Sequence, residues 1–170
     1  MAVLRDGPEG IESLLIQRSV REGDPASGQV GLPGGRKDPG EVTLLGTALR
    51  EAAEEVGLAP GDLAAPPRSL GVFAASAFGL DVAVFVAELG PGSPHLRAAD
   101  PEEVESIFWL PGARLRAPEP VVRTTRLGPL TVAAVRHEGH VVWGFTLRVL
   151  QELLGHLEGS SGGPPTAQPR

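Results

Sequence analysis

Hydrophobic periodicity is strongest between residues 44 and 56, where it predicts an amphipathic helix. Apolar residues recur there at three- and four-residue spacing: Leu44, Leu45, Ala48, Leu49, Ala52 and Val56. Thr43 is a suitable N-cap residue, and Gly57 stands where a left-handed residue commonly ends a helix. We therefore expect a helix from Leu44 to Val56.

The other apolar runs are shorter and predict strands followed by one closing helix. Expected strands lie at residues 12–18, on both sides of a turn near 78–81, at 104–111, and in a hairpin that turns at 137–140. Leu147, Leu150, Leu154 and Leu157 share one side of the closing helix. Helices that accompany irregularly ordered strands indicate an α/β (α+β) protein with a mixed sheet.

Length and composition indicate one globular domain. The chain has 170 residues, of which 41% are hydrophobic and 21% are charged, as in ordinary globular proteins. Residues 158–170 are rich in Gly, Ser and Pro and predict a disordered tail. We expect a single domain over residues 1–157.

Charge and cysteine content exclude several classes of function. A net charge of −6 argues against nucleic acid as a partner. The absence of cysteine removes disulfides, thiolate metal sites and cysteine nucleophiles. The chain shows neither a signal peptide nor an apolar run of the ~18 residues that a membrane span needs. We expect a cytoplasmic protein without a membrane partner.

Glu51, Glu54 and Glu55 lie within one turn of the predicted helix. Like charges at this spacing are mildly destabilising, so a bound cation would offset a real cost. Carboxylate oxygens suit Mg²⁺ or Mn²⁺, and the upstream pair Gly34 and Gly35 lets the backbone approach an ion or phosphate closely. The alternative is an acidic helix face that is only solvated.

Seven residues around this helix have a recognisable spacing: Gly35, Glu41, Arg50, Glu51, Glu54, Glu55 and Gly57. The pattern resembles the Nudix box, the signature of diphosphate hydrolases. Eight residues separate Glu41 from Arg50, one more than in the common form of the box. This longer spacing, with Asp38–Pro39 ahead of it, is similar to the coenzyme A diphosphatase branch of the family.

Two further segments resemble that branch. Residues 14–19, followed by Gly28, are similar to its upstream motif, and "VVWGFTLRVLQELL" is similar to its closing helix. Leu32 stands where the branch usually has Phe. The resemblance implies a Nudix-type α/β/α sandwich with a mixed β-sheet.

The resemblance also implies roles for individual residues. Glu51, Glu54 and Glu55 would hold Mg²⁺ or Mn²⁺, together with a backbone carbonyl of Gly35 or Gly34. Arg50 would orient Glu51. Glu41 would fix the loop over the helix.

Two further roles stay open at this stage. The general base would be a box Glu or an acid of a later loop, where Glu102, Glu103 and Glu105 are candidates and Glu103 is preferred. Acids after Asp100–Pro101 also suit the first turn of a helix. Arg18 would bind a substrate phosphate, or else occupy a solvent-facing strand end.

The substrate implied by the branch is coenzyme A or a derivative, cleaved to 3′,5′-ADP and 4′-phosphopantetheine. An alternative is hydrolysis of ADP-ribose or another nucleoside diphosphate derivative. A third is a nucleotide-binding module without turnover, although such modules usually lose box acids that are present here. The resemblance is also compatible with a homodimer.

Overall fold

The computed structural model describes residues 1–23, 26–75, 79–93, 95–125 and 128–160. Its main sheet contains β1 (Ala2–Gly7), β2 (Gly10–Arg18), β3 (Val30–Gly31), β4 (Arg68–Ala75), β5 (Leu80–Glu88) and β6 (Val104–Pro111). The order is β3-β2-β1-β5-β4, with β6 paired to β2. Among the described strands of this sheet, β1 and β5 pair in parallel and the other pairs are antiparallel, which confirms a mixed sheet.

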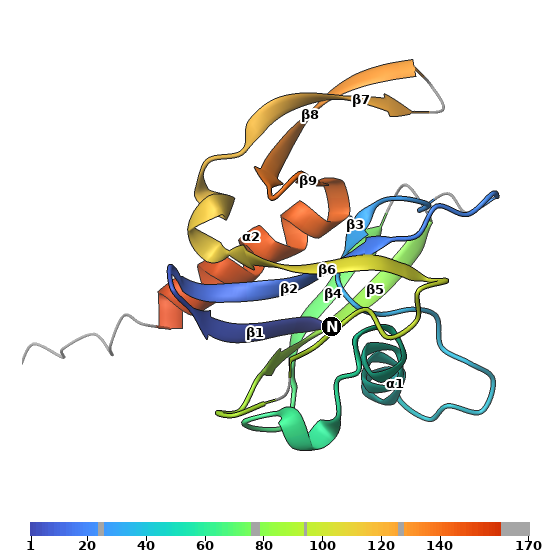
Figure 1. Cartoon of the computed structure of the whole chain (residues 1–170), viewed down its shortest axis with the longest axis vertical. Helices are drawn as coiled ribbons and strands as arrows, with labels where there is room; N and C mark the ends of the chain where they lie inside the picture. Colours follow the sequence, from blue (N-terminus) through green and yellow to red (C-terminus); the bar gives the residue numbers. More distant parts are fainter. Residues whose placement is uncertain (24–25, 76–78, 94, 126–127, 161–170) are drawn as a thin grey trace, which may run out of the picture.

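Two helices, α1 (Leu44–Val56) and α2 (Gly144–Ser160), cover opposite sides of the main sheet (Figure 1). Because neighbouring side chains of a strand point to opposite faces, β2 serves two cores. Leu15 packs in the core that contains Leu150 of α2, whereas Leu14 packs in the core that contains Val56 of α1. The α/β/α sandwich expected from the sequence is confirmed.

A smaller sheet of β7 (Glu119–Thr125), β8 (Gly128–His137) and β9 (His140–Trp143) follows the 3-10 helix η3 (Gly112–Arg116). The β7–β8 hairpin projects from the body of the molecule in Figure 1. A second 3-10 helix, η1 (Pro60–Asp62), follows α1. None of the described helices is both long and apolar enough to cross a membrane.

Several sequence expectations need correction. The strands β1, β3 and β7 were not predicted, because their short or polar segments lack a clear alternation. The segment after Asp100 is a turn that leads into β6, so the alternative of a helical first turn for its acids is wrong. The helix α2 continues to Ser160, past the expected domain end at residue 157. The rest of the expected tail, 161–170, and part of the expected turn near 78–81 lie outside the described residues.

Candidate active site

The helix α1 has the boundaries that its sequence predicts. The Thr43 hydroxyl accepts a 3.0 Å hydrogen bond from the Gly46 nitrogen at the N-terminus. Gly57 adopts a left-handed φ of 73°, and the amides of Gly57 and Leu58 bond to carbonyls of the last turn. Capping at both ends fixes the length of the helix and therefore the position of its acidic turn.

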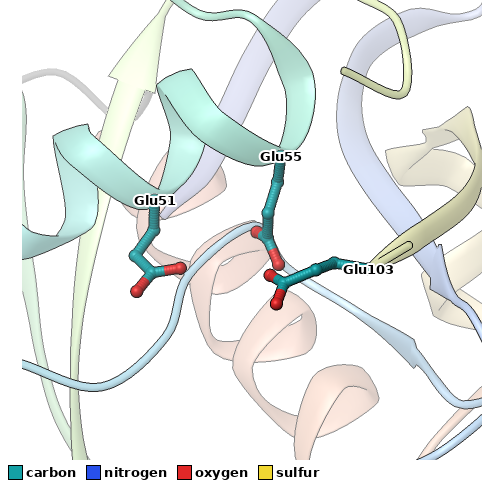
Figure 2. A group of neighbouring side chains, drawn as sticks. All are labelled: Glu51, Glu55 and Glu103. Carbon is teal, nitrogen blue, oxygen red and sulfur yellow. The ribbon is translucent and has the colours of Figure 1, made fainter. Parts of the chain in front are cut away.

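Three carboxylates converge beside this helix. Glu51 and Glu55 of α1 and Glu103 of the turn before β6 each offer an oxygen within 4.8 Å of the others. In Figure 2 the side chains of Glu55 and Glu103 point toward one another, and Glu51 descends from the preceding turn of α1. Glu103 reaches this position because the loop before it bonds to the helix end, where the Ala99 nitrogen donates to the Glu55 carbonyl over 2.9 Å.

Glu54 is not a member of this group. Its carboxylate accepts a 2.7 Å hydrogen bond from Nη1 of Arg50, and its side chain is 56% exposed. The structure therefore brings together two of the three box acids that the sequence offers, and it adds Glu103 from a distant loop. A metal-binding role for Glu54 stays a prediction.

The glycine pair lies directly against these carboxylates. The Gly34 nitrogen donates to Oε2 of Glu55 over 2.8 Å, and Gly34 has a φ of 147°, a conformation that L side chains rarely adopt. A Cβ atom built on Gly35 would lie 2.4 Å from the carboxyl carbon of Glu51. Glycine is needed at both positions, at Gly34 for the backbone angle and at Gly35 for the close approach.

Arg50 forms hydrogen bonds to acids inside and outside the group of three carboxylates. Its Nη2 donates to Glu51 over 2.9 Å, and its Nε donates to Glu41 over 2.9 Å. The bond to Glu41 is the largest contribution that raises the pKa of Arg50 and lowers the pKa of Glu41 to about 2. Arg50 is thus a fixed cation that orients Glu51 from outside the carboxylate cluster.

Glu41 joins the loop before α1 to the helix. Besides Arg50, Oε2 of Glu41 accepts from the Asp38 nitrogen over 2.7 Å and from the Thr47 hydroxyl over 2.8 Å. The role of Thr47 was missed as a separate feature of the sequence. The sequence offers only a weak signal, a threonine directly before Ala48 of the apolar stripe, and the structure shows that this threonine is buried.

Burial dominates the electrostatics of the cluster. The Glu55 side chain is 1% exposed, and burial raises its pKa to about 7, although the bond from Gly34 opposes the shift. Burial also raises the pKa of Glu51. Ionised carboxylates in such a place need a compensating cation, and Mg²⁺ and Mn²⁺ match the all-oxygen donor set. The residues therefore fit the metal that the resemblance implies.

Arg18 lies at the edge of the cluster. Its Nη1 is 3.9 Å from Oε1 of Glu55, and its side chain is 28% exposed. A register shift between Gln17 and Arg18 in the β2–β6 pairing brings Arg18 opposite Val104, next to Glu103. The structure thus places Arg18 at the carboxylates, so it does not occupy a solvent-facing strand end away from them.

Comparisons with known proteins agree with this arrangement. The NUDIX domain family model matches residues 1–126. The proteins named Uncharacterized Nudix hydrolase NudL from Citrobacter koseri and Salmonella newport are 35% and 33% identical over 148 residues, covering 82% of this chain and 72% of each relative.

Solved structures share the fold at low sequence identity. The NUDIX domain of Shewanella oneidensis NrtR complexed with ADP ribose has a TM-score of 0.62 at 19% identity, covering 92% of this chain and 84% of that chain. A C. elegans Ap4A hydrolase binary complex has a TM-score of 0.60 at 18% identity, covering 93% and 94%. The family model and the relatives agree with the glycine turn, the arginine and the helix carboxylates of the site. The chain belongs to the Nudix hydrolases.

Proposed function

We propose that this Nudix hydrolase cleaves the diphosphate bond of coenzyme A or a derivative of it, with Mg²⁺ or Mn²⁺ as cofactor. The observation that carries the hydrolytic part is the convergence of Glu51, Glu55 and Glu103 within 4.8 Å beside the glycine turn. The substrate part rests on the resemblance of residues 14–19 and of the longer box to the coenzyme A diphosphatase branch.

Glu51 and Glu55 are the proposed metal ligands, with Glu54 and the Gly35 carbonyl as further candidates. A divalent ion at these residues would neutralise charge on the diphosphate oxygens and lower the pKa of a bound water. Nη2 of Arg50 donates a 2.9 Å hydrogen bond to Glu51, so the carboxylate keeps its orientation. The Gly34 amide does the same for Glu55.

Glu103 is the proposed general base. It comes from a different segment from the helix acids, and its side chain is 40% exposed, so solvent water reaches it. In the proposed reaction a water oxygen attacks a phosphorus atom of the diphosphate, and Glu103 accepts the proton of that water. The bond from phosphorus to the bridging oxygen breaks, and the second phosphate leaves with that oxygen.

Arg18 is the proposed ligand of a substrate phosphate. A guanidinium group suits a phosphate, and Arg18 stands beside Glu55 at the edge of the cluster. Arg18→Ala should raise KM while kcat changes less, because phosphate binding is shared by the ground state and the transition state. Unchanged KM and kcat would remove this role.

A substrate panel tests the proposal. Coenzyme A, acetyl-coenzyme A, ADP-ribose, diadenosine tetraphosphate and ATP would each be incubated with Mg²⁺ or Mn²⁺, and products identified by mass. The proposal expects 3′,5′-ADP and 4′-phosphopantetheine from coenzyme A, at a higher kcat/KM than for any other compound. Faster turnover of ADP-ribose would contradict coenzyme A as the substrate but would still support hydrolysis at this site. Glu55→Gln serves as the control for a contaminating hydrolase.

A further inference from the structure

Among the described residues, four hydrogen bonds join the turn that carries Glu103 to the chain just after β2. The Ser19 nitrogen and hydroxyl donate to the carbonyls of Glu103 and Pro101, over 2.9 and 3.0 Å. Nε of Arg21 donates to the Glu102 carbonyl over 2.7 Å, and its Nη1 donates to the Glu103 carboxylate over 3.2 Å. One guanidinium group therefore holds both the backbone of the turn and the side chain at its end.

Glu103 needs such a restraint on electrostatic grounds. Its carboxylate lies within 4.8 Å of those of Glu51 and Glu55, and like charges at this separation repel. The two helix acids are fixed by Arg50 and Gly34, whereas Glu103 stands on a turn and is free to swing toward solvent unless something holds it. Within the turn itself, the Glu103 and Val104 amides donate to the Asp100 carbonyl, and these bonds shape the backbone without contacting the Glu103 carboxylate.

We propose that Arg21 is a positioning residue that holds Glu103 against the helix carboxylates. The inference rests on the proposed function of that site. A single exposed ion pair is worth little, and both partners here are 40% exposed. The additional bond to the Glu102 carbonyl changes this, because it already fixes the guanidinium group against the turn, so that pairing with Glu103 loses little further side-chain entropy. Arg21 thus acts through Glu103, in contrast to Arg18, which is proposed to contact the substrate.

Kinetics of single and double variants separate these two kinds of arginine. Arg21→Ala should lower kcat about tenfold, the loss of one charge-assisted hydrogen bond, and leave KM within about twofold. In a Glu103→Gln background the same substitution should change kcat by less than about twofold, because the group that Arg21 positions is already lost. Arg21→Lys should restore part of kcat, since an ammonium group still pairs with Glu103. If Arg21 instead bound the substrate, Arg21→Ala would raise KM by the same factor in the wild-type and Glu103→Gln backgrounds. That result would overturn the proposal.

Hydrogen exchange on the metal-free protein provides a test that does not depend on catalysis. Arg21→Ala should speed exchange of the Ser19, Glu103 and Val104 amides by about tenfold, because the turn opens more often. Arg68→Ala is the matched control, since it removes an exposed 2.8 Å pair with Glu88 elsewhere on the main sheet. It should leave both exchange of the turn and kcat unchanged.

The two measurements distinguish the possible failures. A wild-type chain that hydrolyses no diphosphate but shows the Arg21-dependent exchange would overturn the proposed function and keep the structural restraint. Turnover by wild type, with no change in kcat or exchange in Arg21→Ala, would overturn the role of Arg21 alone.

Discussion

The main-chain nitrogen of Gly34 donates a 2.8 Å hydrogen bond to the buried carboxylate of Glu55, across a sequence separation of 21 residues. This bond joins the glycine turn to α1 and aims the most deeply buried acid of the cluster. The same turn passes so close to Glu51 that Gly35 has no space for a side chain. The geometry of the candidate metal site is therefore set by the turn and the helix together.

Glu55→Gln should preserve the fold and abolish most activity. Glutamine has nearly the same shape, so the buried site stays filled, but one anionic metal ligand is lost. We expect turnover to fall at least about 100-fold, with weaker Mn²⁺ binding in calorimetry. Circular dichroism would confirm the fold. Retention of most activity would exclude Glu55 as a metal ligand.

Gly35→Ala should displace Glu51. The added methyl would lie 2.4 Å from the Glu51 carboxyl carbon, closer than nonbonded atoms approach, so the side chain must move. We expect Mn²⁺ affinity and kcat to fall about 10- to 100-fold. Gly155→Ala is the matched control, because nothing lies within 4 Å of the Cβ position in that part of α2. Equal behaviour of the two variants would contradict the close approach at Gly35.

Arg50→Lys should reduce activity although charge is conserved. The guanidinium group serves Glu41, Glu51 and Glu54 at once, and an ammonium group lacks that planar fork. We expect kcat to fall about 10- to 100-fold as the orientation of Glu51 loosens. Arg68→Lys, in a single exposed pair with Glu88, should behave as wild type. Wild-type kinetics in Arg50→Lys would show that charge alone suffices.

The stability of the metal-free protein should depend on pH through Glu55. Burial raises its pKa from the usual 4.5 to about 7, so the folded state binds more protons than the unfolded state in this window. The free energy of unfolding contributed by Glu55 is therefore present below pH 4.5 and is lost as the pH rises toward 7, by on the order of 3 kcal/mol.

Urea unfolding with a chelator at pH 5 and pH 7.5 measures this effect as the difference between wild type and Glu55→Gln. Glu41 does not contribute to this difference, because its hydrogen bond to Arg50 lowers its pKa to about 2. The Glu41 carboxylate of the folded protein therefore titrates below the pH range of the experiment. The difference should shift in favour of the variant as the pH rises. A difference that is independent of pH would contradict a raised pKa at Glu55.

Local sequence was sufficient to predict α1 and part of its chemistry. Its cap at Thr43, its end at Gly57 and its apolar stripe all follow from contacts within a few residues. The proximity of Glu51 to Glu55 follows from the helical repeat in the same way. The strand β6 was equally clear, because an apolar run ends at a proline.

The short strands were not predictable for the opposite reason. β3 has two residues, and its identity as a strand depends on its pairing with β2 rather than on any pattern of its own. β1 and β7 likewise depend on their partners. Strand propensity is weak where pairing and burial decide the outcome.

The sequence alone was enough to define the helix, the three acids near its C-terminal end and the arginine beside them, because hydrogen bonds and side-chain spacing along a helix are local. Only the tertiary structure decided which acids meet. Packing of the loop before β6 against the end of α1 brings Glu103 to Glu55. Glu54 bonds to Arg50 instead and lies outside the group. The position of Glu103 depends on contacts between segments that are far apart in the chain, and the energies of such contacts cannot be inferred from a local sequence pattern.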